Sequence, residues 1–186
     1  MADGLFYTDL REPFIAADQS AVTLAATNKA LYTASAFPAL GGQYFARIGK
    51  KLRIRVFGKI TTGATPGNLT LGLLYGTGAD ANGTVLASSA AIALIASQTN
   101  VSWEAEFLVH ARSLGSAGTL FVTGSARFNP LVIASTAQPI MIPATAAVVS
   151  GAVDLTAALI LSVQALRSGS TAESMTVQDL EVVALN

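Results

Sequence analysis

One stretch decides the fold class of this 186-residue chain: Lys51-Leu52-Arg53-Ile54-Arg55-Val56-Phe57-Gly58-Lys59-Ile60. Apolar residues recur at nearly every second position, and mostly basic residues stand between them. A β-strand places alternate side chains on opposite faces, so this spacing is typical of a strand with one buried face. No segment shows a comparable 3.6-residue stripe flanked by helix caps. The pattern therefore predicts an all-β protein.

Further short segments show strand character on both sides of this stretch, and together they predict about eight to eleven strands. The expected segments are 22–24, 30–33, 69–75, 85–87, 91–95, 102–112, 119–128, 140–142, 158–166 and 175–185. The dipeptide Asn82-Gly83 is suited to a tight hairpin turn. Many short strands at this spacing favour two packed sheets. We predict an all-β, jelly-roll-like antiparallel β-sandwich over residues 21–186, preceded by a short extended N-terminal arm over residues 1–20.

The arm differs in kind from the rest of the chain. Phe6, Tyr7 and Phe14 are scattered among charged residues without a strand or helix period. Exposed aromatic side chains on a tail are costly unless they pack against something. We interpret these three residues as a candidate docking arm, and the alternative is a frayed terminus.

Charge is scarce for a lone soluble domain. Only 12% of the residues are charged, and Asp154 is the sole charge between Phe128 and Leu166. In globular domains about a quarter of all residues are usually charged, and these residues keep the surface solvated. We expect other copies or other proteins to cover part of this surface.

Two segments supply the candidate contacts between subunits. Strand 158–166 is apolar on both faces, and the connection 131–149 is nearly uncharged. A strand of a free sandwich usually exposes one polar face. The candidate inter-subunit residues are Ile160, Leu166, Leu131, Ile140 and Ile142. The alternative is a long connection folded over its own core.

The composition argues against nucleic acid, a membrane, a metal ion or a cofactor as a partner. Eleven basic residues balance eleven acidic ones, so no general attraction for nucleic acid is expected. The apolar stretches are too interrupted for a membrane span, and the opening residues do not resemble a signal peptide. The chain has no cysteine and a single histidine, His110. We therefore expect no metal site and no cofactor.

Two acidic residues are the strongest enzymatic candidates. Glu104 and Glu106 point the same way from one strand, with Cα atoms about 6.6 Å apart. Such a pair can serve glycoside hydrolysis. The alternative, which we favour, is ion pairing with the basic row Arg53, Arg55 and Lys59. Trp103 suggests a sugar-stacking platform or, in line with its neighbours Phe107 and Val109, a core residue. We predict that the chain is not an enzyme.

Three segments together resemble a set of tailed-bacteriophage virion proteins. They are 49–60, with its lysine-leucine-arginine-isoleucine strand, 68–76, with its leucine-glycine strand, and 101–107, with its tryptophan-glutamate strand. Residues 155–185 look like the closing strands of the same family, so the likeness covers roughly residues 25–185.

The resemblance implies a jelly-roll structural protein of the virion, with no catalytic residues to carry over. It implies a capsid decoration or minor capsid protein, a homo-oligomer that we expect to be a trimer, bound to the major capsid protein. Its place would be the capsid exterior, after assembly in the host cytoplasm. The alternative is a tail-associated or receptor-binding module that recognises a host-surface glycan.

Overall fold

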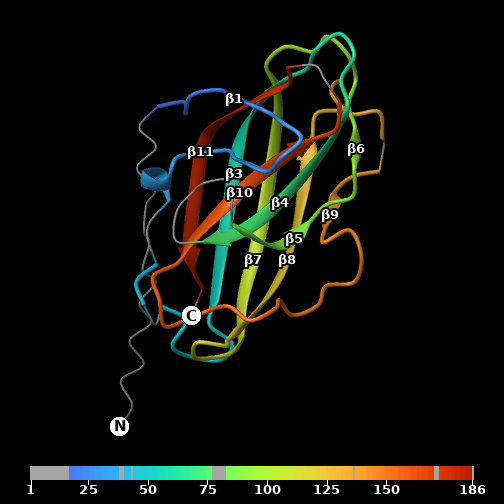
Figure 1. Ribbon diagram of the computed structural model, residues 1–186. Helices are drawn as coiled ribbons and strands as arrows, with labels where there is room; N and C mark the ends of the chain where they lie inside the picture. The colour runs from blue at the N-terminus through green and yellow to red at the C-terminus, as the bar shows by residue number, and fades with distance from the viewer. Residues whose placement is uncertain are drawn as a thin grey trace.

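The structure is a computed structural model that describes residues 17–37, 40–42, 44–76, 83–135, 137–169 and 172–185. Over these residues the chain forms strands and one short 3-10 helix, η1 (Ala34–Ala36). Figure 1 shows the strands, which are β1 (Val22–Thr23), β2 (Lys29–Ala30), β3 (Lys51–Thr61), β4 (Asn68–Gly76), β5 (Thr84–Ser88), β6 (Ile92–Ala93), β7 (Val101–Ser113), β8 (Thr119–Phe128), β9 (Ile140–Ile142), β10 (Ile160–Arg167) and β11 (Ser174–Ala184). Phe6, Tyr7, Phe14 and Asn82 lie outside the described residues.

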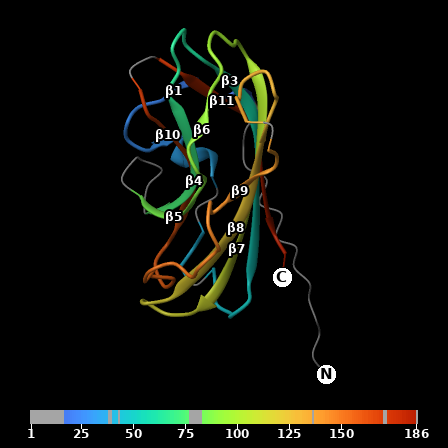
Figure 2. The ribbon, with the colours of Figure 1, turned by 90° about the vertical axis from the view of Figure 1, so that its right-hand side faces the viewer.

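The strands form two antiparallel sheets packed face to face (Figure 2). One sheet has six strands in the order β1-β11-β3-β7-β8-β9. The other has the order β2-β10-β4-β5, and β6 also pairs with β4. The chain crosses between sheets after β1, β2, β3, β6, β9 and β10. The predicted jelly-roll-like β-sandwich is confirmed.

The alternation in β3 is confirmed residue by residue. Leu52, Ile54, Val56 and Ile60 are buried together with Gly58, and Arg53, Arg55, Phe57 and Lys59 are partly exposed. In β7 the row with Trp103 and Phe107 is buried in the same way. The Trp103 ring stacks on Phe128 with ring centroids 6.2 Å apart. Trp103 is therefore a core residue, since only 3% of it is exposed.

Contacts between residues that are far apart in sequence hold the segment before β3 against the two sheets. The Tyr32 hydroxyl donates to the Leu161 carbonyl at 3.0 Å and accepts from the Val163 N–H at 2.9 Å. Burial raises the pKa of this phenol. The Gln19 N–H donates to the Val177 carbonyl of β11 at 2.8 Å. The Asp18 carboxylate pairs with Lys59 of β3 at 2.8 Å.

A buried ion pair joins the two ends of the loop between β10 and β11. Arg167 Nε lies 3.3 Å from Glu173 Oε2, and the Glu173 side chain has no exposed surface. Arg167 also donates to the Leu24 carbonyl at 2.7 Å, and the Leu24 N–H donates to the Glu173 carbonyl at 2.8 Å. This cluster ties the segment after β1 to the closing strands.

Candidate functional site

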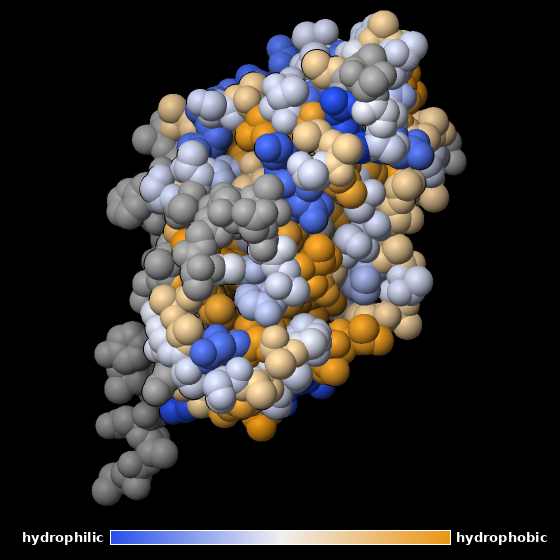
Figure 3. Space-filling view, viewed as in Figure 1, coloured by the Kyte–Doolittle hydropathy of each residue, from blue (hydrophilic) through white to orange (hydrophobic). Residues whose placement is uncertain are grey.

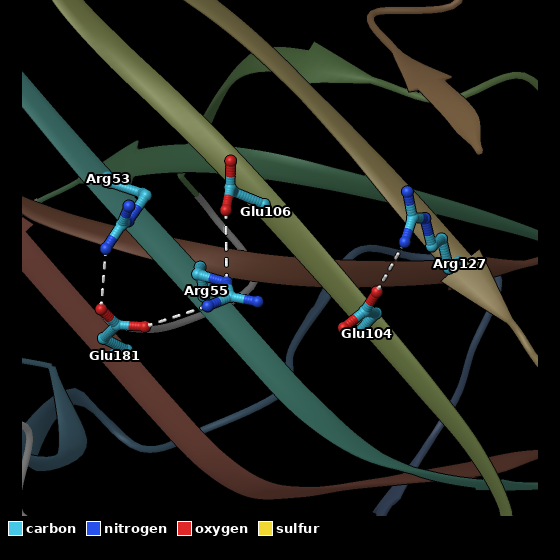
Figure 4. A network of polar contacts seen from close by, with 6 residues as sticks. All are labelled: Arg53, Arg55, Glu104, Glu106, Arg127 and Glu181. Carbon is cyan, nitrogen blue, oxygen red and sulfur yellow. Dashed lines mark hydrogen bonds and ion pairs between the residues drawn. The ribbon is translucent and has the colours of Figure 1, made fainter.

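A charged band crosses the outer face of the six-stranded sheet (Figure 4). We define it by Arg53 and Arg55 on β3, Glu104 and Glu106 on β7, Arg127 on β8 and Glu181 on β11. The strand register creates it, because Arg55 stands opposite both Glu181 and Glu106, and Glu104 stands opposite Arg127. Residues paired across antiparallel strands point to the same face, so opposite charges meet.

The ion pairs in the charged band are partly exposed. Arg53 lies 3.0 Å from Glu181, and Arg55 lies 3.2 Å from Glu106 and 3.6 Å from Glu181. Arg127 lies 3.7 Å from Glu104, and its side chain is 65% exposed. Exposed pairs of this kind contribute about 0–1 kcal/mol each. The band therefore contributes little to stability.

The predicted pairing of the two glutamates is only partly right. Glu106 pairs with Arg55 as expected, whereas Glu104 pairs with Arg127. Arg53 and Lys59 take other partners, Glu181 and Asp18, which the sequence reasoning did not anticipate. Cross-strand register decides these partners, and the order of distant strands β8 and β11 beside β3 and β7 is not visible in the local pattern.

A shallow depression of ≈ 170 Å³ lies in the band, lined by Arg55, Glu104, Ala105, Glu106, Ser125 and Arg127. Two guanidinium groups and two carboxylates in this lining cancel in charge. They offer hydrogen-bond donors and acceptors within reach of solvent. Such a lining suits a neutral, polar ligand better than a net anion or cation.

His110 lies on the same outer face, opposite Lys51 and Phe121. Burial lowers its pKa, and the neighbouring charges of Lys51 and Arg112 lower it further. Among the described residues, no group of three or more His, Cys, Asp or Glu side chains is placed to hold a metal ion. No helix within the described ranges is long and apolar enough to cross a membrane.

An apolar edge borders the charged band. We define it by four exposed residues between β8 and β10: Leu131 (62% exposed), Met141 (62%), Val148 (73%) and Val149 (51%). Met141 stands opposite Ser125, and Val149 bridges to Phe121, so both follow β8 along its outer side. Figure 3 shows tan and orange residues among pale blue ones along the right-hand side of the molecule, where this segment runs. An uncharged segment thus presents large apolar side chains to solvent.

The structure separates the five sequence candidates for subunit contacts. Leu131 is exposed, and Leu166 is partly buried. Ile140 and Ile160 are partly buried and pack against the core. Ile142 is 1% exposed and belongs to the core, so it cannot contact a neighbouring subunit. Its orientation follows from its place opposite Gly124, one residue from the Met141–Ser125 pair.

Met141, Val148 and Val149 were missed by the sequence reasoning. Met141 stands between Ile140 and Ile142, so the run is apolar at every position and its alternation carries no polar marker. The usable signal was the strand period itself, which places Met141 on the face opposite its two neighbours.

No family model and no curated protein matches the chain. Solved structures give distant likenesses. A legume lectin-like domain from Entamoeba histolytica matches at 10% identity and TM-score 0.31, over 87% of this chain and 95% of that one. The CBM2 module of the evolved Dit of Lactobacillus casei BL23 phage J-1 matches at 10% identity and TM-score 0.30, over 89% and 80%.

A protein described as a glycosyl hydrolase from Parabacteroides distasonis matches at 11% identity and TM-score 0.28, over 73% of this chain. The chain spans 64% of the length of that protein. At these TM-scores the likenesses carry no argument about function. The class of protein is set by the chain's own two sheets: an antiparallel β-sandwich with an apolar edge beside a charged band.

Proposed function

We propose that this chain is a non-enzymatic structural protein of a tailed-phage virion, a capsid decoration or cement protein. It assembles as a homotrimer on the capsid exterior, after synthesis in the host cytoplasm, and binds the major capsid protein. The observation that carries the proposal is the apolar edge. Large exposed apolar patches on a soluble domain mark surfaces that other proteins cover.

Charge supports self-association. The chain carries no net charge, with eleven basic and eleven acidic residues. Copies of such a protein do not repel one another, and a net charge near zero favours association. The apolar edge then supplies a charge-depleted interface core, and the adjacent charged band supplies a polar rim.

The capsid assignment is supported by the sequence resemblance of three strands and the closing pair to phage virion proteins. A cement protein acts by bridging neighbouring capsid subunits. Contacts of modest area, repeated by symmetry, gain strength through multivalency. A rigid sandwich with one exposed apolar edge suits this role, because bridging capsid subunits requires no cofactor and no conformational change.

The test adds charge to the apolar edge. The variant Met141→Lys/Val149→Lys is compared with Val85→Lys, which changes an apolar residue that is 48% exposed on β5 of the other sheet. Light scattering gives the mass in solution, and sedimentation with capsids that lack the protein gives attachment. We expect a trimer for the parent and the control and a monomer for the edge variant. A monomeric parent that does not co-sediment would overturn the proposal.

A second candidate function is supported by the depression in the charged band. Its neutral balance of donors and acceptors suits the hydroxyl groups of a saccharide, as in a tail-associated or receptor-binding module that recognises a host-surface glycan. Glycan-array binding that is lost in Arg127→Ala, with the mass in solution unchanged, would favour this function over capsid decoration.

A further inference from the structure

One end of the six-stranded sheet combines exposed apolar residues with basic residues that form no ion pair with any residue the structure describes. We call it the basic end and define it by Arg47, Ile48, Lys50, Arg112, Leu114 and Leu185. Backbone hydrogen bonds hold its parts together: Ala111 to Lys50 at 3.0 Å, Gly49 to Ala111 at 2.8 Å, and Leu185 to Lys51 at 3.1 Å. It is the lower end of the molecule in Figure 1, where β3 begins and β7 and β11 end.

The apolar members of the basic end are well exposed. Ile48 is 69% exposed, Leu114 42% and Leu185 41%. They come from three separate segments that the register brings to the same end of the sheet. This end adjoins the apolar edge at Phe121, which Val149 bridges and over whose ring Arg112 lies.

The positive charges of the basic end lack acidic partners within the described residues. Five other basic side chains are in ion pairs, namely Arg53, Arg55, Lys59, Arg127 and Arg167. Arg47, Lys50 and Arg112 are in none of the ion pairs formed there. Lys50 lies 4.2 Å from the centre of the Tyr44 ring, and Arg112 lies 4.5 Å from that of Phe121. No carboxylate within the described ranges therefore competes with an outside acidic partner for these cations.

The chain's own first sixteen residues have the complementary composition. They contain three carboxylates, Asp3, Asp9 and Glu12, against the single cation Arg11, which leaves a net side-chain charge of −2. They also contain the aromatic residues Phe6, Tyr7 and Phe14. An acidic segment with large apolar side chains is the kind of ligand that a basic surface with apolar residues binds.

We propose that residues 1–16 of one copy dock on the basic end of a neighbouring copy. This inference rests on the proposed self-association and adds a second contact to the one made by the apolar edge. In a cyclic trimer each interface joins two different surfaces, one from each subunit. An acidic segment and a basic end on the same chain provide such a pair. Three copies therefore close a ring in which each copy inserts its segment into one neighbour and binds the segment of the other.

The segment has the necessary reach. Its base is held beside β11 and β3 by the Gln19–Val177 hydrogen bond and the Asp18–Lys59 ion pair. The basic end lies about 26 Å farther along β3, at about 3.3 Å per residue from Lys59 to Lys51. Sixteen extended residues span about 50 Å. Both lengths refer to one copy: if the segment follows its own β3, it passes its own basic end with about half of its length left to extend toward a neighbouring copy.

The absence of cysteine allows a direct test by disulfide cross-linking in the full chain. Thr8→Cys labels the segment, Ser116→Cys labels the β7–β8 turn at the basic end, and Thr99→Cys labels a turn at the opposite end as a control. A mixture of the Thr8→Cys and Ser116→Cys proteins is oxidised, and the covalent dimer that links the two is measured by mass. We expect this dimer to exceed the Thr8–Thr99 control dimer several-fold.

Charge reversal tests the recognition itself. Lys50→Glu/Arg112→Glu in the Ser116→Cys protein is expected to lower the cross-linked yield by about two- to fivefold per charge. The loss of one exposed charge pair changes the equilibrium constant for docking by about this factor. Asp9→Lys/Glu12→Lys in the Thr8→Cys protein is expected to restore it. If the lower yield came from structural damage at the basic end, the reversed segment would not restore it.

Three results would overturn the inference. They are equal yields at Ser116 and Thr99, no rescue by the reversed segment, and a double variant Thr8→Cys/Ser116→Cys that forms only an internal disulfide and no covalent oligomer. If light scattering still gives a trimer in these cases, the proposed function stands and only the docking segment is wrong. A parent that is monomeric at every concentration contradicts both.

Discussion

Replacing Gly58 with alanine tests the packing of the core row that Trp103 occupies. Gly58 stands opposite Trp103 on β7 and Val177 on β11. A Cβ atom at Gly58 would lie 2.1 Å from the Thr176 carbonyl oxygen and 3.0 Å from Trp103 Nε1. The first distance is far below van der Waals contact and involves backbone, so β11 would have to move by about 1 Å or more away from β3.

The expected cost follows from two opposing effects. Overpacking of a well-packed core costs about 1–3 kcal/mol, and more when backbone must shift. Alanine recovers about 0.5–1 kcal/mol by restricting the unfolded chain. We expect Gly58→Ala to lower the free energy of unfolding by about 2 kcal/mol, which corresponds to a Tm decrease of about 4–8 °C for a chain of this size.

Urea unfolding measures this change, followed by circular dichroism and by the fluorescence of Trp103, the chain's single tryptophan. The matched control is Gly151→Ala, because nothing lies within 4 Å of a Cβ atom at Gly151. The control is expected to stay within about 0.5 kcal/mol of the parent. If Gly58→Ala is as stable as Gly151→Ala, the close approach of β3, β7 and β11 described above is wrong.

Further predictions concern the buried ion pair and the histidine. Glu173→Ala leaves Arg167, whose side chain is 14% exposed, without its buried carboxylate, and is expected to cost about 3–5 kcal/mol in urea unfolding. Glu104→Ala, which removes a half-exposed pair with Arg127 at 3.7 Å, is the control and is expected to cost at most about 1 kcal/mol; equal losses would contradict the difference in burial. Burial, Lys51 and Arg112 lower the pKa of His110 in the folded state, so the unfolded chain binds a proton more readily. Stability is therefore expected to fall as the pH drops from about 6.5 through the folded pKa, and His110→Gln is expected to flatten this part of the pH dependence; an unchanged profile would show that His110 does not cause it.

Much of the fold was predictable from local pattern because strand period and turn residues are local properties. The alternation in 51–60 and 102–112 marked the buried rows of β3 and β7, and Trp103 was correctly placed among them. The short strands β1, β2, β6 and β9 also fall within or overlap predicted segments. The assignment of Glu104 failed, since its partner Arg127 is set by the neighbour that β7 acquires in the sheet.

The candidate site was less predictable. The sequence identified the uncharged connection 131–149 as the segment of interest, and Leu131 is exposed there. It did not distinguish Ile142, which is buried, from Met141, which is exposed, because every residue of that run is apolar. In such a run, the register against β8 alone decides which side chain faces solvent.

The sequence by itself determined the strand content, the scarcity of charge and the acidic, aromatic character of residues 1–16, because these are properties of composition and short-range period. Only the tertiary structure decided which charges meet and which stay unpaired. Arg53 and Arg55 pair with carboxylates on β7 and β11, while Arg47, Lys50 and Arg112 lie at an end of the sheet where none of the described residues pairs with them. The reason is physical: sheet order and register place residues from distant parts of the chain within a few ångströms of each other, and no local pattern encodes those neighbours.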